Sequence, residues 1–281
     1  MLRGANPVKS WLRRLAFASL LLRLRLGRRA LVRTMHNLHP HEQGPRTERW
    51  LIGLSERWTT LWIRLNDGEH RPGNVPMVTI AHGDYRDWYA GFEVPESCRG
   101  TLLYFGLVRT YKGVDQLLSA FADCADQSLT LRIMGKADAG PLRDAIEAAQ
   151  TEDGRITAQL NHLSDAEVAR EVGRAELVVL PYRDMFNSGT LVLALSLGRP
   201  VLVPSGEVTS ALADEVGADW IIRYSGALTP EVLINALVTI RRQEPGRAPD
   251  LSRRTWDRVG AQHVSAYRTA ASLMGCGVSE V

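Results

Sequence analysis

Two basic residues, Arg109 and Lys112, follow a predicted buried strand and lie three positions apart in the chain. Gly113 comes next and begins a predicted helix, so both cations lie near a helix N-terminus, where the helix dipole opposes positive charge. An anion bound between them would relieve this conflict through charge-assisted hydrogen bonds. We therefore expect this loop to bind a diphosphate. The alternative is that both side chains are solvated loop charges.

A second segment of small polar residues, Asn187 to Thr190, lies between another buried strand and another predicted helix. Asn187 or Ser188 can cap this helix, and Gly189 lets a ligand approach the backbone closely. Because a cap leaves other first-turn N–H groups free, the same turn, including Thr190, could also bind an anion. Ligands of open α/β sheets bind at the carboxyl ends of strands, which predicts that both segments face one crevice.

The elements that position these residues alternate between strand and helix, which predicts an α/β fold with parallel sheets and right-handed crossovers. In the second half, strands are expected at 101–107, 129–134, 155–160, 176–181, 200–203 and 219–223, and helices at 113–124, 139–150, 164–173, 189–197, 208–215 and 229–241. Around it, we expect helices at 7–27, 46–57 and 251–274 and strands at 30–34, 59–65 and 75–81. We expect three parts: an N-terminal domain at 1–98, a second domain at 99–245, and a helix at 246–281 that crosses back to the N-terminal part.

The charge of the chain is unevenly distributed. Residues 1–34 contain nine basic residues and no acidic one, which leaves 25 basic against 31 acidic residues in the remainder. The body therefore has no charge bias toward nucleic acid, whereas residues 7–29 could contact an anionic membrane surface. The alternative is an ordinary buried helix whose arginines extend to solvent. The apolar run Leu15–Leu22 is much shorter than the about 20 residues of a spanning helix.

Residues 101–241 resemble the nucleotide-sugar-binding domain of GT-B glycosyltransferases. Gly106 and Lys112-Gly113 match the family loop GR-x-x-x-x-KG, whose glycine and basic residues contact the donor diphosphate. The family arginine falls on Leu107 here, and Arg109 is expected to supply that charge instead. The resemblance implies two Rossmann-like domains with parallel sheets. The N-terminal one is expected to be incomplete, because only 35 residues precede His36.

The carboxylates of the family are replaced in this chain. Retaining members have two glutamates, which correspond to Met185 and Leu193, and Asp184 is the available substitute for one of them. The pattern YRDxxNSGxxxxALSLGRPVL resembles bacterial polysaccharide and glycolipid glycosyltransferases, some of which use GDP-mannose.

Histidines and aromatic residues complete the candidates. By resemblance, His36 lies beside the transferred sugar, where it would orient a hydroxyl or act as a base; a loop histidine without this role is the alternative. The segment that contains His82, Tyr85 and Trp88 resembles the HG-x-Y sequence that this family has at the boundary between its two domains. These side chains would either stack on the acceptor or pack the hinge. No metal site is expected at His36, because no second ligand cluster is present.

The resemblance implies a glycosyltransferase that moves a sugar from a nucleoside diphosphate sugar, either GDP-mannose or a UDP-sugar, to a lipid-linked or polysaccharide acceptor. No cofactor is expected. The wide spacing of Cys98, Cys124 and Cys276 favours a reducing cytoplasm. The basic residues of segment 7–29 would allow peripheral attachment at the inner membrane face. The alternatives are a non-catalytic nucleotide-sugar-binding or regulatory module and, as a third reading, a sugar-nucleotide epimerase.

Overall fold

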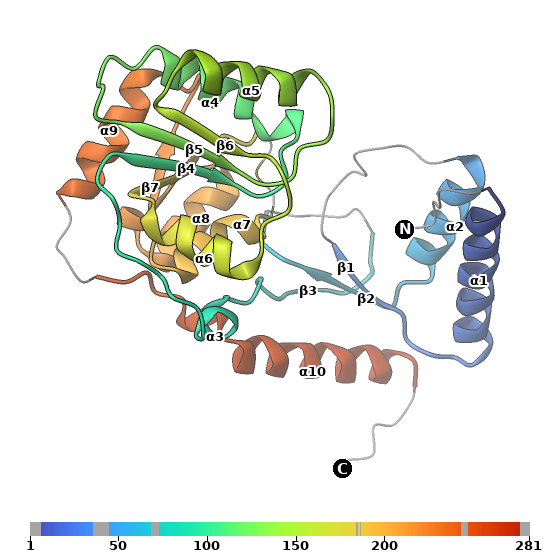
Figure 1. Ribbon diagram of the computed structural model, residues 1–281. Coiled ribbons are helices and arrows are strands. Elements are labelled where there is room, and N and C mark those ends of the chain that lie inside the picture. The colour runs from blue at the N-terminus through green and yellow to red at the C-terminus, as the bar shows by residue number, and fades with distance from the viewer. Residues whose placement is uncertain are drawn as a thin grey trace. The chain divides into compact units, whose positions relative to one another are not determined.

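The computed structural model describes residues 7–35, 45–68, 73–183, 185, 187–242 and 247–275. The chain divides into two units, one made of residues 1–81 with 256–281 and the other of residues 82–255 (Figure 1). The second unit begins well before residue 98, because hydrogen bonds attach the connecting segment to it. Asp84 N donates to Arg254 O at 2.8 Å, and Cys98 N donates to Arg174 O at 2.8 Å.

The first unit contains a parallel sheet in the order β1-β2-β3. Its strands are β1 (Val32–Met35), β2 (Leu61–Arg64) and β3 (Met77–Thr79), and its helices are α1 (Pro7–Leu26), α2 (Arg46–Arg57) and α10 (Trp256–Leu273). Helix α10 packs against β2, where Ala266 and Ala270 allow close approach to Leu61 and Ile63. Among the described residues, no helix has the length and apolar character needed to cross a membrane.

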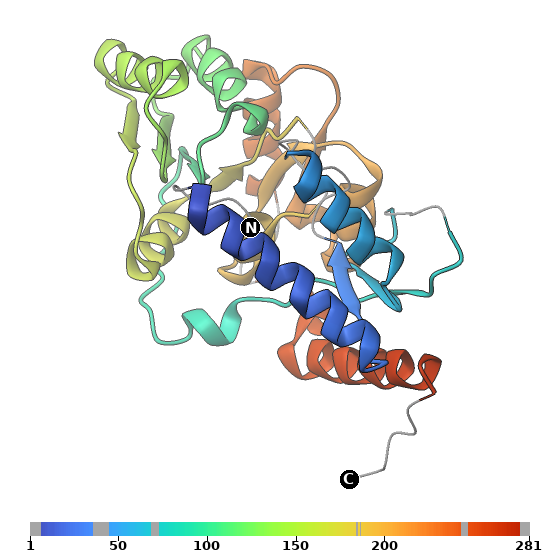
Figure 2. The ribbon, with the colours of Figure 1, turned by 90° about the vertical axis from the view of Figure 1, so that its right-hand side faces the viewer.

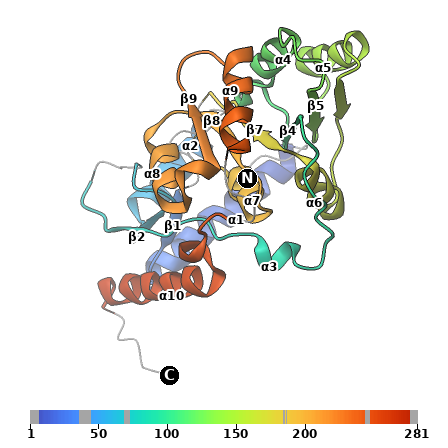
Figure 3. The same ribbon diagram turned by 90° about the vertical axis from the view of Figure 1, so that its left-hand side faces the viewer.

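The second unit is a six-stranded parallel sheet with helices between successive strands (Figure 3). Its strands are β4 (Thr101–Phe105), β5 (Thr130–Met134), β6 (Ile156–Gln159), β7 (Leu177–Val179), β8 (Val201–Pro204) and β9 (Ile221–Tyr224). Its helices are α3 (Arg86–Tyr89), α4 (Val114–Ala122), α5 (Pro141–Glu152), α6 (Asp165–Arg174), α7 (Gly189–Ser196), α8 (Glu207–Val216) and α9 (Pro230–Arg241), with short 3₁₀ turns at η1 (Thr110–Lys112), η2 (Ala218–Trp220) and η3 (Ser252–Arg254). The predicted alternation is therefore confirmed throughout this unit.

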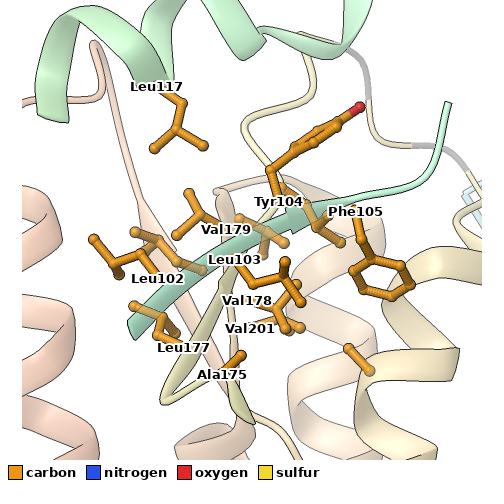
Figure 4. Close-up of a cluster of buried hydrophobic side chains, with 14 of the residues drawn as sticks. Leu102, Leu103, Tyr104, Phe105, Leu117, Ala175, Leu177, Val178, Val179 and Val201 are labelled. Atoms are coloured by element: carbon orange, nitrogen blue, oxygen red, sulfur yellow. The ribbon is translucent and has the colours of Figure 1, made fainter. Parts of the chain in front are cut away.

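Strand β4 is buried along its whole length, as expected for the centre of a parallel sheet covered on both faces. Figure 4 shows side chains of β4 alternating between the two faces, with Leu117 of α4 on one side and Val201 of β8 among the neighbours on the other. Tyr104 is fully buried, and its hydroxyl donates to the carbonyl oxygen of Leu107 at 2.8 Å. This bond satisfies a polar group at the end of an apolar strand.

The sheet has the strand order β6-β5-β4-β7-β8-β9. Successive strands are added outward in one direction from β4 to β6 and in the other direction from β7 to β9, so the strand order reverses between β4 and β7. In such sheets the two loops that leave the reversal point diverge to opposite faces and open a crevice at the carboxyl ends of the strands. The loop after β4 contains Gly106, Arg109 and Lys112, and the segment after β7 ends at Ser188. The topology therefore brings the two predicted anion-binding segments to one edge of the sheet.

We predict that Gly135→Ala will destabilise the second unit strongly. Gly135 has φ +140°, and an added Cβ would overlap the carbonyl oxygen of Gly106. Strain and overpacking together should cost about 3 kcal/mol of unfolding free energy, measured by urea titration with circular dichroism. Gly154→Ala is the matched control, because its Cβ would meet nothing within 4 Å. Equal stability of the two variants would contradict this account of the loop packing.

Candidate active site

The loops after β4 and β7 pack directly against each other. Gly113 has φ +67° and lies so close to Pro181 that a Cβ at this position would overlap the Pro181 carbonyl oxygen. Glycine is required here both for the left-handed backbone and for the close approach. The contact fixes η1, and therefore Lys112, beside the residues that follow β7.

Lys112 is held by an aromatic side chain that the sequence analysis did not assign to the site. Its Nζ donates to the Tyr182 hydroxyl at 3.1 Å and lies 4.6 Å from the centroid of the Tyr182 ring. Tyr182 is itself only 5% exposed. The ammonium group therefore makes a hydrogen bond and a cation–π contact with one buried residue.

Burial lowers the pKa of Lys112 from its ordinary value. The nearby Tyr111 favours the charged amine and raises this pKa, whereas the positive charge of Arg109 lowers it further, and burial is the largest of the three effects. No carboxylate among the described residues pairs with this ammonium group, and a desolvated ammonium group gains more from a bound anion than a solvated one does. Its partial burial therefore suits Lys112 to contact with negative charge.

The N-terminus of α7 lies next to this amine. An added Cβ on Gly106, whose φ is +109°, would lie 3.3 Å from Thr190 Oγ1 and 3.9 Å from Lys112 Nζ, so Gly106, Lys112 and Thr190 converge. Ser188 Oγ accepts from Leu191 N at 3.1 Å and caps the helix. This cap leaves the N–H groups of Gly189 and Thr190 without an intrahelical acceptor, as the first turn of any helix does.

The Tyr182 hydroxyl connects these parts. Burial raises the pKa of Tyr182, and hydrogen bonds with the side chains of Thr190 and Ser188 act in the opposite direction. One phenol therefore presents its ring face and hydroxyl oxygen to the amine from the β4 loop and lies close to the hydroxyls at the start of α7. The sequence could have indicated a role for Tyr182, because this aromatic residue follows the buried strand in a segment that is otherwise rich in polar residues.

Arg109 differs from Lys112 in its surroundings. Its guanidinium forms an ion pair with Asp138 at 2.7 Å, and the two side chains are 35% and 63% exposed. Exposed pairs of this kind contribute about 0–1 kcal/mol, so a more highly charged anion can compete for the arginine. The structure thus places Arg109 at the same edge of the sheet but joins it to a carboxylate from the loop after β5.

His82 and Tyr85 lie against the first residue of α7. A Cβ added to Gly189 would lie 2.9 Å from the Tyr85 hydroxyl and 3.6 Å from His82 Nε2. His82 Nδ1 donates to Gly83 O at 2.8 Å, which leaves Nε2 to accept from the Tyr85 hydroxyl at 3.4 Å. Burial raises the pKa of Tyr85. The pair therefore presents a neutral phenol beside the α7 N-terminus.

The remaining predicted residues are not all brought together. Trp88 Nε1 donates to Asp165 at 3.1 Å and so connects α3 to α6. Asn187 adjoins the Ser188 cap and is half-buried. His36 and Asp184, the two predicted catalytic residues, lie outside the described residues. Within the described part of the chain, no group of three or more His, Cys, Asp or Glu side chains could hold a metal ion.

The pKa of Lys112 can be measured directly, because Lys9, Lys112 and Lys136 are the lysines of the sequence. After reductive ¹³C-methylation, the NMR signal that disappears in Lys112→Arg should titrate below the ordinary lysine value of about 10.4. The cause is burial against Tyr182, so guanidinium unfolding should return the signal to the ordinary range. A native-state pKa at or above the ordinary value would contradict a desolvated amine.

Comparisons with known proteins identify the family and the fold of the chain. Residues 99–240 match the family described as glycosyl transferases group 1. The chain is 43% identical over 276 residues to a GDP-mannose:glycolipid 4-beta-D-mannosyltransferase of Xanthomonas campestris pv. campestris, covering 98% of this chain and 78% of the relative.

Solved structures show the same fold. HepE of Anabaena in complex with UDP and glucose has a TM-score of 0.61 at 16% identity, covering 93% of this chain and 74% of HepE. Sucrose-phosphate synthase of Thermosynechococcus elongatus has a TM-score of 0.65 at 16% identity, covering 93% and 72% of the two chains. The expected GT-B fold class is confirmed by these neighbours. The chain belongs to the group 1 glycosyltransferases.

Proposed function

We propose that this glycosyltransferase moves mannose from GDP-mannose to a glycolipid acceptor. The observation that carries the proposal is the convergence of Lys112, Gly106 and Thr190 at the reversal point of the sheet. The mannosyl donor and the glycolipid acceptor are supported by the name of the relative that is 43% identical over nearly the whole chain. The UDP complex of the neighbouring fold supports a nucleotide in this kind of domain.

In the proposed mechanism the second unit stabilises the departing diphosphate. Negative charge grows on the diphosphate as the bond between the sugar carbon and the phosphate oxygen breaks, so groups that bind this charge more tightly in the transition state accelerate the reaction. Lys112 supplies a fixed positive charge, and the N–H groups of Gly189 and Thr190 supply hydrogen bonds along the α7 dipole. GDP leaves with the electron pair of the broken bond.

Arg109 and Asp138 form a pair that the donor can rearrange. Their ion pair is partly exposed and is therefore weak, whereas a diphosphate offers more negative charge at the same edge. We propose that Arg109 turns from Asp138 to the donor. Tyr182 is a positioning residue, because it acts on the diphosphate only through Lys112, Ser188 and Thr190.

The acceptor side of the proposed reaction involves histidines, an aspartate and a tyrosine. His36 remains the proposed group for orienting the sugar or removing the acceptor proton, and Asp184 the proposed substitute for a missing family glutamate. His82 and Tyr85 are proposed to contact the acceptor, since they lie beside Gly189. Because Lys112 and the α7 amides supply the positive charge, the proposed transfer requires no cofactor.

A glycolipid acceptor requires access to a membrane. We propose that the protein is cytoplasmic and binds peripherally at the inner membrane face through the basic residues between Pro7 and Arg29. Seven of the nine basic residues of the acid-free segment 1–34 lie between Pro7 and Arg29, within or just after α1. Each basic residue near an anionic surface contributes about 1 kcal/mol.

The transfer itself is tested with radiolabelled donors. The protein, supplied with GDP-mannose and lipids extracted from bacterial membranes, should move label into the lipid-soluble fraction. UDP-glucose should not replace GDP-mannose. Transfer from UDP-glucose alone would overturn the proposed donor, and GDP binding without any transfer would favour a non-catalytic module.

The diphosphate contact is tested with Lys112→Ala. Losing a charge-assisted hydrogen bond should weaken GDP binding by at least about 1.5 kcal/mol, or roughly tenfold, by isothermal titration calorimetry. Lys9→Ala removes the same group from α1 and should leave the dissociation constant unchanged. An unchanged constant in Lys112→Ala would remove this residue from the site.

The role of Tyr182 is tested with Tyr182→Phe, which keeps the ring and removes the hydroxyl. The lost hydrogen bonds should weaken GDP binding by about 0.5–1.5 kcal/mol, while Tyr182→Leu, which also removes the cation–π contact, should weaken it further. Tyr224→Phe, at another buried tyrosine, is the control. If Tyr182→Phe changes thermal stability and leaves both GDP binding and the NMR titration of Lys112 unaltered, the tyrosine is only structural.

A further inference from the structure

The first unit contains a pocket of about 230 Å³ that no part of the transfer reaction uses. It lies between the end of α1, the end of α2 and the residue after α10; α1 and α2 face the viewer in Figure 2. Three arginines from these elements line it, together with an apolar wall. The arginines are Arg25, Arg29 and Arg57, and the wall includes Leu21, Leu24 and Trp58.

The pocket lies at the end of the sheet opposite to the one where sugar transfer is expected. Leu31, which precedes β1, and Thr60, which precedes β2, both line it, so it adjoins the amino ends of these strands. Ligands of α/β domains bind at the carboxyl ends. A cavity of about 230 Å³ is smaller than the roughly 300–1,000 Å³ of typical ligand pockets, so it fits a small headgroup better than a nucleotide sugar.

The charges around the pocket are of one sign. Among the described residues, its lining contains three guanidinium groups and no carboxylate, and all three arginines are exposed. Among the ion pairs formed by described residues, none involves Arg25, Arg29 or Arg57. Guanidinium groups bind phosphate in a bidentate geometry. An anion of phosphate size would offset the mutual repulsion of these arginines.

The hydroxyl groups in the pocket are already used within the protein. Thr60 Oγ1 accepts from Leu31 N at 3.1 Å, and Thr59 Oγ1 donates to Ser55 O at 2.8 Å. Recognition must therefore come from the arginines and the apolar wall together. This combination suits an amphiphile with one anionic group better than a sugar, which needs many free hydrogen-bonding partners.

Helix α1 presents an apolar surface next to the pocket. Its exposed residues at helical spacing include Trp11, Leu12, Leu15, Leu22 and Leu26, with exposures from 47% to 75%. Residues three apart are neighbours on a helix surface, so Arg25 of the pocket adjoins Leu22 of this stripe. Exposed apolar residues combined with an acid-free basic segment are complementary to an anionic bilayer, and not to a free anion.

We propose that this pocket binds the phosphate headgroup of an anionic phospholipid while the apolar stripe of α1 lies in the bilayer interface. The inference rests on the proposed membrane contact and gives it a specific recognition site. It does not depend on the identity of the sugar donor or acceptor. Arg25, Arg29 and Arg57 hold the phosphate, and Leu24 and Trp58 contact the first carbons of the lipid.

A monomeric lipid separates pocket binding from surface attraction. We would titrate the full chain with dihexanoyl phosphatidylglycerol below its micelle concentration, using isothermal titration calorimetry, with glycerol 3-phosphate and inorganic phosphate as lipid-free probes. The short-chain lipid should bind, and the lipid-free probes should bind at least about tenfold more weakly, because they lack the apolar contact. Equal binding of inorganic phosphate would show a free-anion site and overturn the proposal.

Matched variants locate the site. The double variant Arg25→Gln with Arg57→Gln should weaken short-chain lipid binding by about tenfold or more, through loss of charge-assisted bonds. Arg23→Gln with Arg46→Gln removes the same charge from the same two helices outside the pocket and should bind as the wild type does. Circular dichroism melting confirms that all variants fold. An equal loss of short-chain lipid affinity in the two double variants would overturn the proposal that the lipid binds in this pocket.

Vesicle flotation tests the membrane contact separately from lipid binding in the pocket. Wild-type protein should float with vesicles of phosphatidylglycerol and phosphatidylcholine and should not float with phosphatidylcholine alone. Flotation without binding of the short-chain lipid would leave the membrane contact in place and remove the pocket. No flotation and no short-chain binding would overturn both.

Discussion

The buried contact between Lys112 and Tyr182 is the interaction on which the candidate site depends. An amine that has lost part of its hydration is stabilised by a hydrogen-bond partner or by negative charge, and among the described residues its partner is a phenol at 3.1 Å. The phenol holds the amine in place without neutralising it. Positive charge therefore remains available between β4 and β7, where the order of the strands reverses. A diphosphate site requires this property.

Backbone packing explains why this contact is possible. Gly113 lies against the Pro181 carbonyl, and Gly135 lies against that of Gly106, so three loops meet where any side chain larger than hydrogen would separate them. The left-handed φ angles of these glycines follow from the same crowding. Stability and function are therefore coupled here: the packing that orients Lys112 also limits what the chain can tolerate nearby.

Much of the fold could be predicted because the central strands β4, β7 and β8 are largely apolar runs and several helices have a clear start, such as the capping box at Ser164. The convergence of Gly106, Lys112 and Thr190 followed from strand order. Tyr182 and Asp138 could not be assigned from sequence, because their partners come from loops after other strands and depend on side-chain direction. The pocket beside Arg57 could not be predicted from the sequence either, because it is formed by three elements that are distant in sequence. His36 and Asp184 remain predictions from resemblance.

A crystal structure of the protein with GDP would test the central claim most directly. The account predicts a β-phosphate oxygen within about 3 Å of Lys112 Nζ and of an N–H group in the first turn of α7, with Tyr182 still in contact with the amine. A diphosphate bound elsewhere, with Lys112 turned toward Tyr182 alone, would contradict it.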